Sequence, residues 1–217
     1  MASEVSICNL ALAHLSNQAN IASLMEQSVE AQLCSQFYPI ARDQVLAKHN
    51  WSFNTKRVSL AALANDSLQW AYSYARPSDC LSIVAMLVPG ALDDFDQQDY
   101  VQEQNTSGIL VLRTNVVNAV LKYCVKITDP TLFEANFVVA TSYLLASFLA
   151  GPITKDMQLK KSMAEAYKLM VGEAATSNAN DSQNNAYGAK HVPTSLTGRV
   201  DGTEARPDTL TDFGTAW

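Results

Sequence analysis

Apolar residues recur at helical spacing over the first fifty residues of the chain. Ser3 can cap a helix that continues to about Leu15, because Val5, Cys8 and Leu12 form one apolar stripe along it. Polar residues directly after Leu15 end this pattern. The pattern therefore predicts a first amphipathic helix whose apolar side needs a packing partner.

A second helical pattern starts at Ser28 and continues to about His49. Pro39 lies inside it, where a proline removes a backbone donor and clashes with the preceding turn. We therefore expect either a kink near Phe37–Pro39 or two abutting helices. The next segment, Phe53–Leu63, is compatible with a helical piece or with an extended one.

The spacing of the apolar residues shortens to two in the middle of the chain, which is typical of β-strands. Five stretches separated by turn-forming residues have this character: Trp70–Tyr74, Cys80–Val88, Tyr100–Gln104, Ile109–Thr114 and Ala119–Ile127. Short strands joined by turns predict one small, mostly antiparallel sheet inserted between two helical halves.

The helical pattern returns after Asp129, a good N-cap residue that is followed by a proline suited to a first turn. We expect a helix over Pro130–Ala150 that Gly151-Pro152 terminates. The apolar run inside it, Ala135–Ala150, is too short to span a membrane and contains several polar residues. It is therefore interpreted as a buried core helix.

A final helix is expected from about Thr154 to Thr176, and the character of the chain changes around its end. Polar turn-forming residues dominate there, and the apolar residues no longer recur at helical or strand spacing. Such a segment buries too little apolar area to offset the entropy lost when it becomes ordered. Isolated apolar residues are nevertheless spaced through it: Tyr187, Val192, Leu196, Val200, Leu210, Phe213 and Trp217. This composition is typical of an arm that orders against a partner, although a tail without a role would have a similar one.

These patterns together predict a mixed α+β chain that is mainly α. An antiparallel helical bundle, formed by residues 1–65 and 128–178, is interrupted by a β-rich insertion over residues 66–127. An extended C-terminal arm follows over residues 179–217. The seven spaced apolar residues of that arm are its candidate partner-binding residues.

Composition and charge narrow the classes of partner. The chain has 217 residues, a net charge of −6, 48% hydrophobic residues and only 17% charged residues, below the roughly 25% typical of soluble domains. A chain with so little charge is often partly covered by other subunits. No Lys/Arg run is longer than the pair Lys160–Lys161, which disfavours sequence-specific DNA binding but permits an acidic wall along which DNA slides.

The nucleophilic and titratable residues form no recognised catalytic or metal-binding pattern. His14, His49 and His191 are isolated, which is more typical of packing or capping residues than of a general base. The four cysteines are scattered among apolar residues and are interpreted as buried, reduced thiols: Cys8, Cys34, Cys80 and Cys124. No catalytic residue, cofactor site, metal site or membrane segment is predicted.

One acidic cluster, Asp93, Asp94, Asp96 and Asp99, follows the second expected strand. Carboxylates at alternate positions are similar to a calcium-binding loop, but the glycine and the terminal glutamate of such a loop are absent. A solvated loop is the simpler interpretation.

Five segments, taken in order along the chain, carry a family likeness. They are Ile7–Leu15 (ICNLALAHL), Tyr38–Phe53 (YPIARDQVLAKHNWSF), Lys56–Ala61 (KRVSLA), Trp70–Ile83 (WAYSYARPSDCLSI) and Ile127–Thr154 (ITDPTLFEANFVVATSYLLASFLAGPIT). They resemble the head-to-tail adaptor of short-tailed bacteriophages, known as the tail tubular protein A family. The likeness covers residues 3–178 and is a diffuse pattern rather than a catalytic motif; the stretch after Asn180 is not matched.

The resemblance implies a structural virion protein without enzymatic activity. Family members form a ring, usually of twelve copies, between the portal protein and the tail nozzle protein, and genomic DNA passes through it without sequence-specific binding. The protein would be made in the cytoplasm of the host bacterium and reside in the neck of the virion. The family has no shared catalytic residues, and the matched polar and aromatic residues are expected to be architectural: Arg42, Asp43, Trp51, Arg57, Pro77, Asp79, Asp129 and Pro130.

Two other functions remain open from the residues alone. A virion-associated hydrolase of cell-wall or capsular glycans could use acids of the Asp93–Glu103 region, provided two carboxylates lie roughly 5–10 Å apart in a cleft. A nucleic-acid-binding packaging factor is the other, although the acidic composition argues against it.

Overall fold

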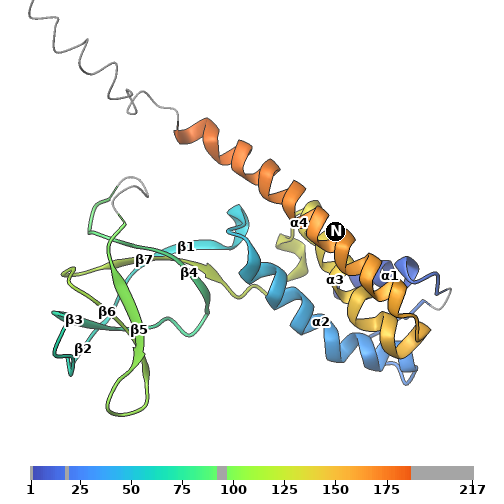
Figure 1. Ribbon diagram of the computed structural model, residues 1–217, viewed down its shortest axis with the longest axis horizontal. Helices are drawn as coiled ribbons and strands as arrows, with labels where there is room; N and C mark the ends of the chain where they lie inside the picture. Colours follow the sequence, from blue (N-terminus) through green and yellow to red (C-terminus); the bar gives the residue numbers. More distant parts are fainter. Residues whose placement is uncertain (1, 18–19, 92–96, 187–217) are drawn as a thin grey trace, which may run out of the picture. The chain divides into compact units, whose positions relative to one another are not determined.

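The computed structural model describes residues 2–17, 20–91 and 97–186 of the chain (Figure 1). The chain divides into two units, Met1–Asn178 and Ala179–Trp217. Within the described residues the fold is a mixed α+β fold with more helix than strand, which confirms the predicted class.

Four α-helices account for the helical part of the described residues: α1 (Glu4–His14), α2 (Val29–Lys48), α3 (Ala135–Thr154) and α4 (Met157–Ala186). The predicted cap of α1 is confirmed, and Ser28, where the second helical pattern starts, caps α2. The Ser3 hydroxyl accepts from the Ser6 amide at 3.0 Å, and the Ser28 hydroxyl accepts from the Ala31 amide at 3.3 Å. A capping hydroxyl satisfies one of the free amides of a first turn, which fixes where each helix begins.

Pro39 does not divide the second helix, so the expectation of two abutting helices was wrong. It lies within α2 on an exposed position, flanked on the inner side by the buried residues Tyr38 and Ala41. The carbonyl that the proline leaves without a donor belongs to Ser35, which is also exposed and accessible to water. Packing of the inner side therefore keeps α2 a single helix.

Both expected ends of the third helix were also wrong. Asp129 caps a short 3-10 turn, η2 (Pro130–Leu132), by accepting from the Thr131 amide at 2.9 Å, and α3 begins only after Glu134. At the other end α3 continues through Gly151 and Pro152, both of which face partly or fully outward. It stops where Lys155 takes a left-handed φ of 54° and donates to the Ala150 carbonyl.

The last helix is longer than the sequence pattern predicts. It continues to Ala186 rather than ending near Thr176, so residues 179–186 are helical where an extended arm was expected. Asn, Asp and Ser predominate there and are weak helix formers, but extending a helix that is already nucleated costs less than starting a new one.

Seven strands form two antiparallel sheets within the described residues, where one sheet was expected. They are β1 (Thr55–Ser59), β2 (Ala62–Leu63), β3 (Tyr72–Ala75), β4 (Cys80–Leu87), β5 (Tyr100–Gln104), β6 (Leu110–Thr114) and β7 (Val120–Val125). The strand orders are β1-β7-β4 and β2-β3-β6-β5. The β-rich part therefore begins at Thr55, inside the range expected for the helical bundle, because β1 pairs with β7 from Thr55↔Cys124 onward.

Each part has its own apolar core. Tyr74 and Leu112 of one sheet pack with Met86, Leu121 and Tyr123 of the other. The helical core contains aromatic rings at its centre, and the ring of Phe137 on α3 lies 5.3 Å from that of Trp51.

The helix α3 is central to the helical core. It contacts α1 and α2, and ten of its residues are buried. Its length and apolar composition would also suit a membrane span, but its buried residues identify it here as the core helix that the sequence predicts.

Candidate interaction surfaces

The seven predicted partner-binding residues of the arm, Tyr187 to Trp217, lie outside the described residues. Their role remains a prediction. The surfaces that the structure does describe are two hollows, two ion-pair groups and several exposed apolar side chains.

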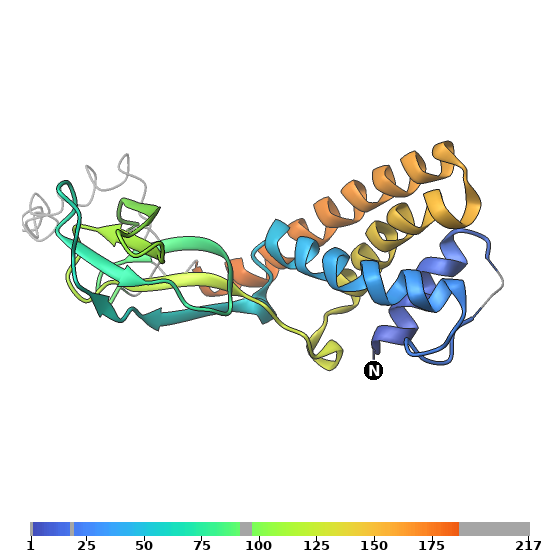
Figure 2. The same ribbon diagram turned by 90° about the horizontal axis from the view of Figure 1, so that it is seen from below.

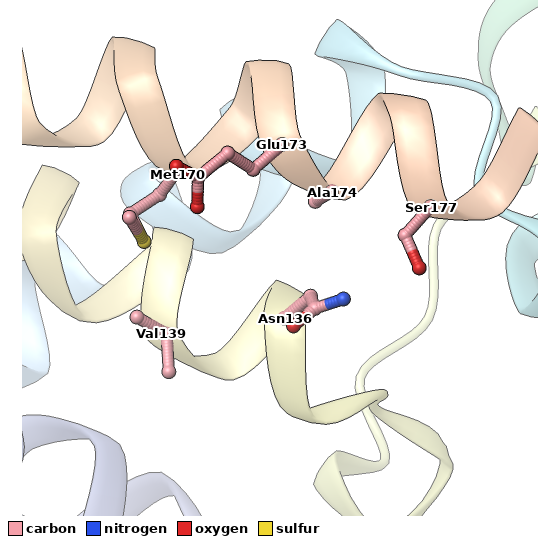
Figure 3. A pocket seen from close by; sticks show the side chains of 6 residues that line it. All are labelled: Asn136, Val139, Met170, Glu173, Ala174 and Ser177. Atoms are coloured by element: carbon pink, nitrogen blue, oxygen red, sulfur yellow. The ribbon is translucent and has the colours of Figure 1, made fainter.

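The first hollow is a groove of about 350 Å³ between α3 and α4. Asn136 and Val139 of α3 lie opposite Met170, Glu173, Ala174 and Ser177 of α4 (Figure 3). Val139 and Met170 supply apolar surface, while the amide, the carboxylate and the hydroxyl supply polar groups. The lining contains one carboxylate and neither a histidine nor a cysteine, so it suits contact with a side chain better than acid–base chemistry.

The second hollow, of about 450 Å³, lies beside β1 and the turn before β4. Asp79 is its main charged group: it accepts a hydrogen bond from the Tyr123 hydroxyl at 3.0 Å, and its other oxygen lies 3.5 Å from Lys56 Nζ. Burial and the hydrogen bond to Asp79 raise the pKa of Tyr123 to about 12. Tyr123 therefore remains protonated at neutral pH and acts as a donor.

The residues matched in the family likeness include an ion-paired group at the junction of α2 and β7. Arg42 is buried and donates to Asp43 Oδ1 from two nitrogens, at 2.9 and 2.8 Å. Asp43 Oδ2 lies 2.7 Å from Lys126 Nζ. This group ties the middle of α2 to the residue after β7, which agrees with the expected architectural role.

Trp51, Asp129 and Pro130 also have structural positions. The fully buried Trp51 donates from Nε1 to the Val45 carbonyl at 2.9 Å, which fixes the chain as it leaves α2. Asp129 and Pro130 form the capped 3-10 turn before α3.

A second ion-paired group, around Arg113 of β6, was not anticipated. Arg113 is buried, with Nη2 2.9 Å from Asp66 Oδ1 and Nε 3.2 Å from Glu103 Oε2, the latter an ion-pair contact rather than a directed hydrogen bond. The Thr106 amide donates to Asp66 at 2.7 Å and, together with Arg113, lowers the pKa of that carboxyl. The loop before β3 is thereby held to the β5–β6 hairpin.

This pairing bears on the acids proposed for glycan hydrolysis. Asp93, Asp94 and Asp96 lie outside the described residues, and Asp99 is an exposed residue just before β5. Glu103 serves the ion pair with Arg113. The described acids of this region are therefore not brought together as a pair of carboxylates in either hollow.

The histidines and cysteines of the described residues are packed rather than gathered into a site. His14 lies 3.1 Å from the Ser142 hydroxyl and stacks on Tyr143, and burial lowers its pKa. The four cysteines are buried free thiols, as predicted. Across residues 2–17, 20–91 and 97–186 no group of three His, Cys, Asp or Glu side chains is placed to hold a metal ion.

Comparison with known protein families finds no family model that matches the chain, and comparison with curated proteins finds no matching sequence.

Proposed function

We propose that this protein is a structural virion component, a head-to-tail adaptor that joins the portal protein to the tail nozzle protein of a short-tailed bacteriophage. Copies of the chain, twelve in number as the family likeness implies, would form a ring around the path of the genomic DNA. The chain would act without a cofactor, and its place would be the neck of the virion.

The observation that carries this proposal is the division of the chain at Asn178. A packed unit ends there, and the following segment is polar but carries seven spaced apolar residues. The helix α4 runs from the packed unit into this segment, to Ala186. Such a segment gains apolar burial chiefly by contact with another surface, which is what an adaptor requires.

The residues of the family likeness support the proposal in a second way. Asp43, itself paired with Arg42, joins α2 to the residue after β7 through its ion pair with Lys126. Trp51 holds the chain between α2 and β1 by its indole hydrogen bond to the Val45 carbonyl. A protein that couples two assemblies needs this internal rigidity, because a loose junction would not transmit the position of one partner to the other.

The charge of the chain supports the proposed DNA path. A net charge of −6 disfavours retention of the phosphate backbone, so an acidic ring would let DNA pass without binding it.

The test is binding of the full chain to the portal protein encoded by the same genome, with and without the segment after Ala186. A chain ending at Ala186 keeps α4 intact and should bind the portal much more weakly. Equal binding by the two forms would overturn the proposed role of the arm.

A further inference from the structure

The charges of the helical part are unevenly distributed between its helices. Residues 1–41 contain three glutamates and neither a lysine nor an arginine. Residues 155–168, which end α3 and begin α4, contain four lysines, two acids and no arginine. One of these acids, Asp156, accepts from the amides of Gln158 and Leu159, so its charge is engaged with the start of α4.

The outward side of α4 combines lysines with an exposed apolar side chain. Met157, Lys161 and Lys168 fall within about 40° of one another around a helix of about 3.6 residues per turn. Met157 is 61% exposed. Neither Lys161 nor Lys168 makes an ion pair with a residue that the structure describes. Met157, Lys161 and Lys168 are called the lysine face.

The turn before α2 and the first residues of α2 have a similar composition with the opposite charge. Met25 is 92% exposed and Val29 is 65% exposed, and they lie next to Glu26 and Glu30. Glu26 accepts from the Ala22 amide at 3.1 Å, and Glu30 lies 3.4 Å from the Asn17 amide nitrogen. These neutral donors orient the two carboxylates without cancelling their charge. The four residues 25, 26, 29 and 30 are called the glutamate face.

The lysine face on α4 and the glutamate face at the turn into α2 lie at the same end of the helical group. Figures 1 and 2 both show α2 and α4 beginning at that end. Figure 2 shows α3 between α4 and α1. Each copy therefore has two faces of opposite charge at the same end of its helical group. A contact between the lysine face of one copy and the glutamate face of the next can repeat from copy to copy and close into a ring.

We infer that the lysine face of one copy docks on the glutamate face of a second copy. Glu165 of the same helix is near both lysines in sequence but makes no described ion pair with either of them. Each lysine side chain then gains a carboxylate partner from the second copy, and the exposed side chains of Met157, Met25 and Val29 are covered together. This contact would join the copies in the ring of the proposed function, and only its place in a ring rests on that proposal. The contact itself is measured between copies of this chain, without any portal protein.

Carbodiimide coupling of the full chain tests the contact directly, because this reagent joins only carboxylates and amines that touch. Equal amounts of ¹⁴N-labelled and ¹⁵N-labelled protein are mixed, coupled and digested. Mixed-isotope peptides that join Glu26 or Glu30 to Lys161 or Lys168 are expected. Their absence, with intermolecular links elsewhere or none at all, overturns the inference.

Charge reversal gives an independent test by sedimentation. Lys161→Glu/Lys168→Glu makes both faces acidic, and Glu26→Lys/Glu30→Lys makes both basic. Each variant alone should self-associate at least tenfold more weakly than the original chain, and an equimolar mixture of the two should regain association. A mixture that stays dissociated although both variants melt like the original chain overturns the inference.

The matched control is Lys48→Glu/Lys160→Glu, which changes the net charge by the same amount. Both lysines are exposed, and Lys160 lies about 100° from Lys161 around α4. This variant should associate like the original chain; a loss equal to that of the Lys161 and Lys168 variant would show a general charge effect and overturn the assignment. Failure of portal binding with these contacts intact would count against the proposed function alone.

Discussion

Lys126 Nζ lies 2.7 Å from Asp43 Oδ2, which joins the residue after β7 to the middle of α2. The two partners of Asp43 differ in burial: the side chain of Arg42 is 6% exposed, whereas that of Lys126 is 46% exposed. Loss of the exposed partner and loss of the carboxylate charge should therefore have different consequences.

Asp43→Asn should lower the free energy of unfolding by about 1–3 kcal/mol, because it leaves the buried Arg42 cation without a charged partner. Lys126→Met should cost less than about 1 kcal/mol, as expected for an exposed ion pair. Urea unfolding of the two variants measures the difference. If Lys126→Met costs as much as Asp43→Asn, the buried guanidinium is not what the carboxylate stabilises.

The hydroxyl of Tyr123 should make stability depend on alkaline pH. Burial and the hydrogen bond to Asp79 raise its pKa from an ordinary value near 10 to about 12. Because the unfolded chain loses this proton first, the contribution is fully present below about pH 10 and is lost as the pH rises towards 12. The urea midpoint of the original chain should fall more steeply over this range than that of Tyr123→Phe; parallel curves for the two proteins would contradict the assignment.

Arg113→Met should loosen the loop before β3 more than it loosens the core. The variant removes the cation that faces Asp66 and Glu103, at a cost of about 1–3 kcal/mol. Amide hydrogen exchange should accelerate over residues 64–71, since Arg113 and the Thr106 amide hold Asp66 to the β5–β6 hairpin. Glu103→Gln is the control and should cost less than about 1 kcal/mol, because that side chain is half exposed. Unchanged exchange in Arg113→Met would refute this role.

The predicted anchors of the arm can be tested one at a time. An anchor that buries its side chain contributes about 1.5–3 kcal/mol before ordering costs. Phe213→Ala and Trp217→Ala should therefore each weaken binding to the portal about tenfold or more, without a change in melting temperature. Thr215→Ala, between them in sequence, should bind like the original chain. Equal affinity for all three would show that the apolar side chains are not the anchors.

Local signals in the sequence predicted the elements that depend on local chemistry. The cap Ser3, the start of the second helix at Ser28 and the strand Tyr100–Gln104 agree with the structure. The alternation of apolar residues is a local property, and so is the demand of a first turn for a hydroxyl acceptor.

The remaining features depend on contacts between distant residues. The pairing of Thr55–Ser59 with residues 120–124 divides the strands into two sheets, and nothing near Thr55 indicates that partner. Asp129 was correctly identified as a cap, but it caps the short turn Pro130–Leu132 and not the long helix that was expected to start at Pro130. Tertiary packing decides where that turn ends and α3 begins. Arg113 had no sequence signal, because its carboxylate partners come from a loop and a neighbouring strand.

Electron microscopy of the full chain mixed with the portal protein of the same genome tests the central claim most directly. The account predicts a ring of this protein stacked on the portal, with density from the segment after Ala186 running onto a neighbouring subunit or the portal. A portal that stays bare at saturating concentrations of the chain, or a ring whose arms fold back into their own subunits, would contradict it.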